Sequence, residues 1–239
     1  MSAGEVMLQV EALNAFYGRA QVLFDVALNV QRGEVVALLG RNGAGKSTTM
    51  KALMGLLTHT RGKVLFRGQD ISAAQTHRIA RMGMGYVPEE RRIFTDLNVL
   101  QNLEVGRQPP RRDALTWTPE KLFSLFHNLG EMPLRGGAQM SGGEQQMLTV
   151  ARTLMGNPYL LLLDEPSEGV APVIVEQMAQ MIVQLKRAGM SILLSEQNLH
   201  FAAQVSDRAY VLENGHIHYQ GTMAQLAADS TVQRVYLSL

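Results

Sequence analysis

The sequence predicts an α/β fold with three parts: a mostly parallel sheet, an antiparallel β subdomain near the N-terminus and a helical insert. Continuous apolar segments alternate with amphipathic helical patterns, which is typical of a parallel sheet whose two faces are covered by helices. The first segments alternate apolar and polar residues, as strands with one exposed face do. No convincing strand pattern occurs between Glu89 and Pro158, and this stretch defines the insert.

Short strand patterns separated by glycine-containing turns fill the first third of the chain. After Ser47 the apolar residues instead recur at the spacing of one helix face. We expect the earliest strands to form the antiparallel platform and a helix to follow Ser47. The predicted strands are Met7–Val10, Val22–Val30, Val35–Leu39 and Lys63–Arg67, and the predicted helix face is Met50, Leu53, Met54 and Leu57.

Helical patterns broken by prolines occupy the insert, at Val99–Val105 and Lys121–Leu129. Strand and helix patterns then alternate again, and Asn214-Gly215 marks a hairpin turn. These later elements are the strand Tyr159–Leu163, the helix Val173–Arg187 ending at Gly189, the strand Ser191–Ser195 and the hairpin Tyr210–Tyr219. We therefore predict one domain with a core at 1–88 and 159–221, a helical subdomain at 89–158 and a short C-terminal segment at 222–239.

Composition excludes several classes of protein. The 239 residues carry a net charge of +1, whereas a dedicated nucleic-acid binder usually has a pronounced basic excess. Cysteine is absent, which excludes a disulfide scaffold and a thiolate zinc site and is compatible with the cytosol. No secretory signal pattern is visible, and no run reaches the roughly 18 apolar residues of a membrane helix. We expect a chain that does not span a membrane alone.

A glycine-rich loop lies between the predicted strand Val35–Leu39 and the helix that follows. It satisfies the pattern G-x-x-x-x-G-K-[ST], in which glycines let successive backbone N–H groups point at phosphate oxygens. Lys46 would reach the β- and γ-phosphates, and the Ser47 hydroxyl would bind Mg²⁺. The flanking strand and helix disfavour an ordinary glycine-rich turn. The predicted phosphate-binding residues are Gly40, Arg41, Asn42, Gly43, Ala44, Gly45, Lys46, Ser47 and Thr48.

Two acidic residues follow the apolar run Leu160–Leu163. A carboxylate at the C-terminal end of a strand beside the phosphate loop can hold Mg²⁺, and Asp164 fits this role. The next carboxylate can orient and deprotonate an attacking water, and Glu165 fits that role. The alternative is an acidic strand end that faces solvent. The pair favours nucleotide hydrolysis, because kinases and many GTPases lack the second acid.

A second potential anion site occurs at Met140–Gln146, directly before a helical pattern. A serine hydroxyl and uncovered glycine N–H groups there would form a helix start suited to phosphate. It has no lysine of its own, which suggests that two copies of the chain share each nucleotide. By itself the string is weak evidence, because such sequences more often form flexible turns or helix caps.

In this order and spacing, the three motifs resemble the ATP-binding cassette (ABC) family over nearly the whole chain. The resemblance implies that two domains close head to tail on two ATP molecules. Ser141, Gly142, Gly143 and Glu144 would then face the γ-phosphate held by Lys46 of the other copy. Tyr17 matches the aromatic residue that stacks on adenine, with a strand aromatic of the core as the alternative. The segment 167–170 matches the loop that links the two active sites.

The sequence departs from the usual pattern of the family at two positions. Glu89 stands where a glutamine is common; it can accept a hydrogen bond from Mg²⁺-bound water but cannot donate one. Gln197 stands where a histidine is common; it can donate to the γ-phosphate but cannot carry a proton charge. Glu165 is left as the sole candidate base, and Gln197 is the second predicted catalytic residue. The predicted metal-site residues are Ser47, Asp164 and Glu89.

Three segments resemble one branch of the family, namely 88–92, 165–169 and 195–198. The branch comprises ATP-binding subunits of branched-chain amino acid importers and relatives that serve urea and short amides. It implies an ATPase that uses Mg²⁺, pairs with a second ATP-binding subunit, identical or homologous, and drives membrane-spanning permease subunits supplied by a solute receptor. The chain would lie in the cytoplasm at the inner face of the membrane. Ile93 and Phe94 would contact a partner helix.

Two other functions are open alternatives. A non-transport ABC ATPase of DNA repair would need a long coiled-coil insertion, and one of translation would usually need a second cassette; 239 residues leave room for neither. A phosphoryl-transferring kinase is disfavoured by Glu165 and by the string at 140–146. Import rather than export follows from the resemblance alone.

Overall fold

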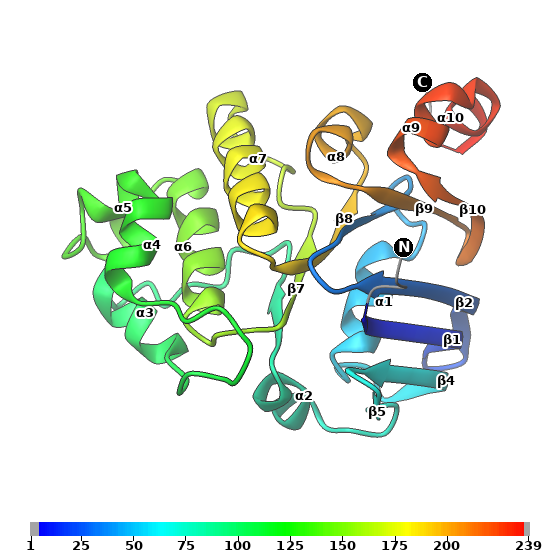
Figure 1. Cartoon of the computed structure of the whole chain (residues 1–239), viewed down its shortest axis with the longest axis horizontal. Coiled ribbons are helices and arrows are strands. Elements are labelled where there is room, and N and C mark those ends of the chain that lie inside the picture. The colour runs from blue at the N-terminus through cyan, green and yellow to red at the C-terminus, as the bar shows by residue number, and fades with distance from the viewer. Residues whose placement is uncertain (1–4, 237–239) are drawn as a thin grey trace.

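The computed structural model describes residues 5–236, which form two sheets with helices around them (Figure 1). The first sheet has the strand order β2-β1-β4-β5 and the second the order β10-β9-β3-β8-β7-β6. All neighbouring strands of the second sheet are parallel except the β9–β10 pair. The predicted fold class, a mostly parallel sheet with an antiparallel subdomain, is confirmed.

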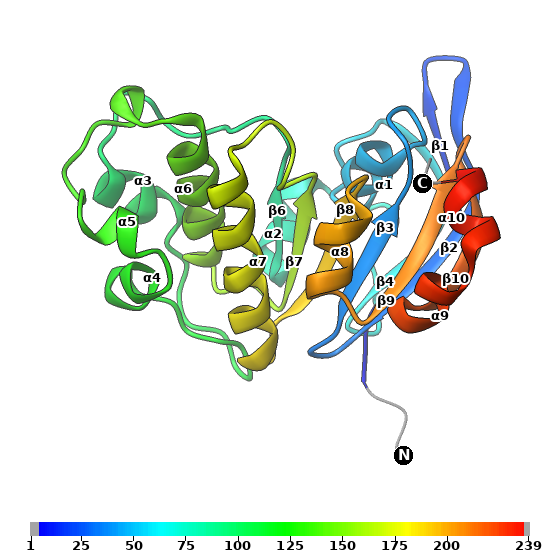
Figure 2. The ribbon, with the colours of Figure 1, turned by 90° about the horizontal axis from the view of Figure 1, so that it is seen from above.

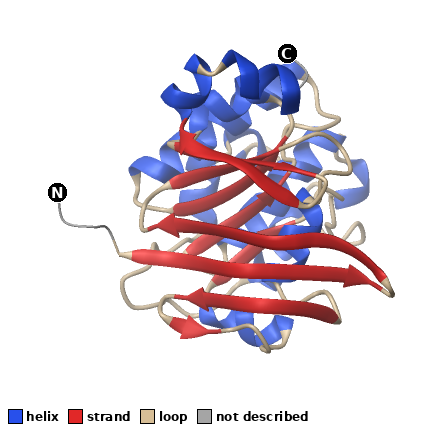
Figure 3. Ribbon diagram, turned by 90° about the vertical axis from the view of Figure 1, so that its right-hand side faces the viewer, coloured by secondary structure: helices blue, strands red, loops and turns tan. Residues whose placement is uncertain are grey.

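The antiparallel sheet contains long strands that the alternation pattern revealed only in part (Figure 3). Its strands are β1 (Val6–Tyr17), β2 (Ala20–Gln31), β4 (His59–Phe66) and β5 (Gln69–Asp70). The pairing register of β1 with β2 shifts between Val10 and Leu13, and Ala12 has a positive φ of 48°. This bulge interrupts the alternation of apolar and polar side chains along the strand. The sequence pattern therefore predicted the strand only as far as Val10.

The parallel sheet comprises the strands that carry the site. They are β3 (Val35–Leu39), β6 (Met84–Val87), β7 (Leu160–Asp164), β8 (Ser191–Glu196), β9 (Arg208–Glu213) and β10 (His216–Thr222). Every residue of β3, β7 and β8 is buried. The β9–β10 hairpin turns at Asn214 and Gly215 with φ of 48° and 78°, as their sequence predicts.

Helices cover both faces of the parallel sheet. Leu160 and Leu162 face a cluster that contains α1 (Lys46–Leu53) and the antiparallel sheet, whereas Leu161 and Leu163 face α7 (Pro172–Arg187) and α8 (Leu199–Val205). Helix α1 is therefore sandwiched between the two sheets, and α7 and α8 lie on the opposite face (Figure 2). The predicted helix continued to Leu57; it ends at Leu53 because Gly55 adopts a left-handed φ of 65°.

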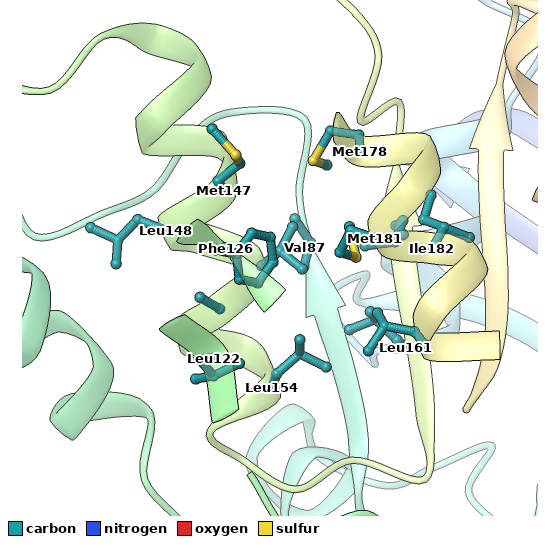
Figure 4. Packing of buried hydrophobic residues seen from close by; sticks show 14 of the residues in the cluster. Val87, Leu122, Phe126, Met147, Leu148, Leu154, Leu161, Met178, Met181 and Ile182 are labelled. Carbon is teal, nitrogen blue, oxygen red and sulfur yellow. The ribbon is translucent and has the colours of Figure 1, made fainter. Parts of the chain in front are cut away.

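The insert is helical, as predicted. Its helices are α3 (Val99–Gly106), α4 (Pro119–Leu125), α5 (His127–Gly130), a 3₁₀ turn at Gly137–Gln139 and α6 (Gly142–Leu154). Phe126 and Met147 of the insert pack in one cluster with Met178 and Met181 of α7 (Figure 4). The insert and the sheet thus share a continuous core.

Several short helices have no clear pattern in the sequence and were not predicted: α2 (Thr76–Met82), α8, α9 (Met223–Ala228) and α10 (Ser230–Tyr236). In α2 only Ile79 is buried, so no apolar periodicity exists for a pattern to detect. Residues 237–239 of the predicted C-terminal segment lie outside the described chain. Within residues 5–236, no helix combines the length and apolarity needed to cross a membrane.

Candidate nucleotide site

The glycine-rich loop follows β3 directly and leads into α1. Gly45 has a left-handed φ of 109°, and a Cβ atom there would lie 2.8 Å from Leu23 Cδ2. A Cβ atom on Gly40 would lie 2.3 Å from the carbonyl oxygen of Leu212. Gly43 also has a positive φ, but no atom lies within 4 Å of its Cβ position, so its surroundings are open. Glycine is therefore required at Gly40 and Gly45 by close packing, and it leaves space beside the loop at Gly43.

Lys46 is buried at the start of α1, where it joins the loop to the acidic strand end. Its Nζ donates to the carbonyl oxygens of Gly40 and Arg41 at 2.8 and 3.0 Å. The same Nζ lies 3.0 Å from Oε1 of Glu165. The loop, the lysine and the second carboxylate are thus assembled around one ammonium group.

Asp164 ends β7 and receives three hydrogen bonds from hydroxyl groups. Ser47 and Ser195 donate to Oδ1 at 3.0 and 2.6 Å, and Tyr86 donates to Oδ2 at 3.0 Å. Burial raises the pKa of Asp164, while the three hydrogen bonds oppose that rise. Burial and the Asp164 carboxylate raise the pKa of Tyr86 well above its ordinary value, so its hydroxyl stays a donor. The structure brings together Ser47 and Asp164, both predicted metal-site residues.

Glu165 begins the loop after β7 in an unusual conformation. Its φ is 48°, a left-handed value that is uncommon for a residue with a side chain. Its backbone N–H donates to the carbonyl oxygen of Ser195 at 3.1 Å. Oε1 pairs with Lys46, whereas no N–H group in residues 5–236 donates to the buried Oε2. A carboxylate oxygen with spare acceptor capacity is suited to receive a proton.

Two further carboxylates, those of Glu168 and Glu89, interact electrostatically with Glu165. A hydrogen bond to Glu165, which requires a proton on Glu168, is the main cause that raises the pKa of Glu168 to about 7. Burial, followed by the charges of Glu165 and Asp164, raises the pKa of Glu89. Negative charge therefore accumulates at the end of β7.

The Glu168→Gln variant tests this accumulation of negative charge. Because the folded pKa of Glu168 is about 7 against an ordinary 4.5, folding takes up a proton between these values, and stability falls as pH rises through this window. The Glu168→Gln variant has no carboxyl at this position and does not lose stability in this way. Without nucleotide or Mg²⁺, we expect it to melt about 1–2 °C above the wild type at pH 8, a figure reduced for solvent screening, with the difference shrinking toward pH 5. Thermal unfolding across pH, with Glu176→Gln as the exposed control, measures this; a constant difference would contradict it.

The oxygen donors of the site suit Mg²⁺. No three His, Cys, Asp or Glu side chains of residues 5–236 converge as a ready metal cage. Mg²⁺ in proteins usually takes one or two carboxylates and completes its shell with water and substrate phosphates. Asp164 supplies a carboxylate of this kind. Ser47, whose hydroxyl donates to Asp164 beside the glycine-rich loop, adds a further oxygen.

Gln197 lies directly after β8, the strand next to β7 in the sheet, with its side chain exposed. The buried Glu196 holds this strand end. Its Oε1 accepts from the backbone N–H of Ser167 at 3.1 Å, and its Oε2 accepts from those of Gln197 and Asn198 at 3.1 Å. Glu196 thus ties the loop after β7 to the loop after β8.

The serine–glycine string forms the N-terminus of α6, as predicted. Ser141 accepts from the backbone N–H of Glu144 at 3.3 Å, and Glu144 accepts from that of Ser141 at 2.6 Å. This reciprocal capping box satisfies the helix start and leaves Ser141 exposed. Within residues 5–236, no hydrogen bond or ion pair joins 141–144 to the glycine-rich loop. The two segments that the sequence predicts to bind phosphate are therefore separate within one chain.

Tyr17 is the last residue of β1 and is 49% exposed. It is not a buried core aromatic, which was the alternative interpretation. Its ring is accessible at the end of the antiparallel sheet.

Three residues of the site had no predicted role: Tyr86, Ser195 and Glu196. Each lies near the C-terminal end of a strand in the parallel sheet, where ligand sites of α/β proteins form. Their place at the C-terminal ends of strands was the signal that could have identified them. Their partners could not be read from the chain, because Tyr86 and Ser195 lie 78 and 31 residues from Asp164.

The known proteins that resemble this chain all belong to one family. The sequence matches the family described as ABC transporter over residues 23–168. It is 42% identical to the high-affinity branched-chain amino acid transport ATP-binding protein BraG of Pseudomonas aeruginosa, over 97% of this chain and 99% of the relative. It is 37% identical to the lipopolysaccharide export system ATP-binding protein LptB of Escherichia coli K12, over 93% of each. It is 31% identical to the probable branched-chain amino acid transport ATP-binding protein LivF of Archaeoglobus fulgidus, over 98% of this chain and 99% of the relative.

Solved structures agree in fold. A nucleotide-free ATP-binding cassette from an ABC transporter superposes with a TM-score of 0.80 at 27% identity, over 95% of this chain and 97% of that one. The ADP conformation of an ATP-binding cassette of an ABC transporter superposes with a TM-score of 0.79 at 26% identity, over 96% and 97%.

Proposed function

This chain belongs to the ABC transporter family and is an ATP-binding, ATP-hydrolysing transporter subunit, and on that premise we propose that it powers the uptake of branched-chain amino acids. The observation that supports this solute is the identity to the branched-chain amino acid transport protein, which extends over almost the full length of both chains. The resemblance of segments 88–92, 165–169 and 195–198 to the same branch agrees with it.

The proposed reaction uses residues at the C-terminal edge of the parallel sheet. Backbone N–H groups of residues 40–48 and Lys46 hold the phosphates, and Ser47 and Asp164 would hold Mg²⁺, with Glu89 accepting from a bound water. The ion would neutralise charge on the β- and γ-phosphates. Glu165 takes the proton of the attacking water on its carboxylate. Gln197 donates to the γ-phosphate.

A second copy, or a homologous subunit, completes each site in this proposal. In the part of the chain that the structure describes, residues 141–144 form no hydrogen bond with the glycine-rich loop of their own chain. They form a helix start that suits phosphate, in which Ser141 is exposed and the next three residues are half-buried. Head-to-tail pairing would place them opposite Lys46 of the partner. We further propose the division into a core at 1–88 and 159–221, a helical subdomain at 89–158 and a C-terminal segment from 222.

Tyr17 provides a test of the nucleotide's position. Stacking of a base on an aromatic side chain contributes about 1–3 kcal/mol. We expect Tyr17→Ala to weaken ATP binding about tenfold and Tyr17→Phe to preserve it. The melting temperature of both variants should equal that of the wild type, because the ring is half exposed. Fluorescence titration with a labelled ATP measures the affinity; equal affinities for all three proteins would remove Tyr17 from the site.

A groove of about 610 Å³ between the sheet and the helical insert is the proposed contact with a permease subunit. Leu56, Phe94 and Val105 line it, and each is a large apolar residue with about half of its surface exposed. The sequence predicts that both Ile93 and Phe94 contact a partner helix. Only Phe94 faces the groove, because Ile93 packs against the internal cluster of the insert.

Replacing Phe94 tests the groove. Truncating a central apolar contact of an interface typically costs about 2 kcal/mol, so we expect Phe94→Ala to weaken binding to purified permease subunits about thirtyfold. ATP hydrolysis by the isolated chain should be unchanged. Leu134→Ala is the matched control, since Leu134 is 74% exposed and does not line the groove. Equal weakening in both variants, or in neither, would place the contact elsewhere.

Transport itself decides the solute and the direction. Similarity to the lipopolysaccharide export protein supports export as the second candidate, and urea or short amides are further candidates. The chain, its permease subunits and the solute receptor would be reconstituted in vesicles. ATP-dependent uptake of leucine, isoleucine or valine supports the proposal. Uptake of urea alone, or export without uptake, overturns it. In this role the chain is peripheral on the cytoplasmic face of the membrane.

A further inference from the structure

The segment that joins β6 to the helical insert carries an arginine whose contacts the reaction above does not use. Nη2 of Arg91 donates to the carbonyl oxygen of Gly169 at 2.7 Å. The same guanidinium lies against Gly142, because a Cβ atom there would be 2.2 Å from Nη1 and 3.1 Å from Cζ. One side chain therefore contacts both the first residue of α6 and the loop that begins at Glu165.

The contact with Gly142 depends on glycine, because any side chain there would displace the guanidinium. A Cβ atom on Gly169 would lie 3.4 Å from Nη2, an ordinary van der Waals distance, so the guanidinium also packs beside this residue. The planar fork of arginine suits such a double contact, since its N–H groups point in fixed directions while its faces remain free to pack. Lysine has a single flexible ammonium and cannot make both contacts in the same way.

Arg91 differs from nearby arginines in its partner. Arg92 lies 3.4 Å from Glu90, and Arg135 lies 3.6 Å from Glu144, as exposed arginines commonly do. Among residues 5–236, no aspartate or glutamate forms an ion pair with Arg91. Its hydrogen bond goes instead to a main-chain carbonyl, so it acts on the position of a loop.

That loop is short and firmly connected to the catalytic carboxylate. The backbone N–H of Glu168 donates to the carbonyl oxygen of Glu165 at 3.1 Å. Ser167 is anchored to Glu196 at 3.1 Å. A displacement of Gly169 would therefore be transmitted over three residues to Glu165.

We propose that Arg91 is a positioning residue that holds the α6 N-terminus at Gly142 and the loop of Glu165 in a fixed mutual arrangement. The inference rests on the proposed function, in which Gly142 serves the nucleotide of the partner copy while Glu165 serves that of its own. Arg91 then couples the two nucleotide sites of the pair. A change at one site reaches the other through this guanidinium.

Kinetics of the full chain test the coupling. We expect Arg91→Met to lower the turnover rate at saturating ATP about tenfold, the effect of one hydrogen bond to a charged group, and to reduce the Hill coefficient from about 2 toward 1. ATP affinity, measured in a Glu165→Gln background, should stay within about twofold, because Arg91 does not contact the phosphate-binding loop. The turnover rate of Arg91→Lys should lie between those of the wild type and Arg91→Met. Arg112→Ala is the control, since its side chain is 95% exposed.

Hydrogen exchange supplies a readout that a change in folding alone would not reproduce. In Arg91→Met, amides of 141–145 and of 165–170 should both exchange faster, with an unchanged melting temperature and unchanged exchange in the central sheet. Wild-type turnover and cooperativity in Arg91→Met, or faster exchange in only one of the two segments, overturns the inference. If the wild-type chain itself does not hydrolyse ATP, the proposed function fails instead, so the two failures are distinguishable.

Discussion

Replacing Glu165 with glutamine is expected to reduce ATP hydrolysis about 10³-fold while ATP binding and pairing of two copies persist. A positioned general base contributes roughly 10²–10⁴-fold to a rate, and glutamine cannot accept the proton of the attacking water. Glutamine has the same shape, and Lys46 keeps its hydrogen bonds to the carbonyl oxygens of Gly40 and Arg41. Within the reaction cycle, the loss is therefore expected in the chemical step.

Phosphate release, labelled-ATP titration and gel filtration with ATP measure these three properties of the Glu165→Gln variant. Glu176→Gln, an exposed carboxylate on α7, is the matched control and should hydrolyse normally. Undiminished turnover in Glu165→Gln would show that another group is the base. Glu168 would then be the next candidate, because a hydrogen bond to Glu165 raises the pKa of its carboxyl to about 7.

Replacing Lys46 with methionine should have the largest effect on ATP binding. The ammonium group lies beside the loop that we propose binds the phosphates. We expect at least about a hundredfold loss of ATP affinity, about the energy of one strong charge-assisted hydrogen bond. The substitution should also destabilise the free protein. It leaves the buried Glu165 carboxylate without its cation, and breaking a buried ion pair from one side costs about 3–5 kcal/mol.

A double-mutant cycle separates the two effects of Lys46. The Lys46→Met/Glu165→Gln variant should recover most of the lost free energy of unfolding, because glutamine carries no charge, but it should not recover ATP binding. Urea unfolding and ATP titration measure the two quantities. Lys63→Met, which removes an exposed lysine of β4, controls for the loss of a positive charge. Equal stability of Lys46→Met and the wild type would mean that the ion pair contributes nothing to folding.

Much of the fold was predictable because its signals are local. The glycines, lysine and hydroxyl residues of 40–48 are contiguous, and the apolar run of β7 ends directly at Asp164. The parallel strands are continuously buried, so their sequences are continuously apolar. Elements with few buried residues, such as α2, lacked such a signal. The bulge at Ala12 likewise concealed the length of β1.

By itself, the sequence determined the fold class, the family to which the chain belongs, and the places of the glycine-rich loop and of the two carboxylates after β7. Each of these depends on residues that are neighbours in the chain or recur at a fixed period. Only the tertiary structure decided that Tyr86 and Ser195 hold Asp164, that Glu196 ties two loops together, that Ile93 points inward while Phe94 faces the groove, and that Arg91 spans Gly142 and Gly169. The physical reason is that these contacts join residues tens of positions apart, and their partners meet only once parallel strands and packed helices bring distant segments together.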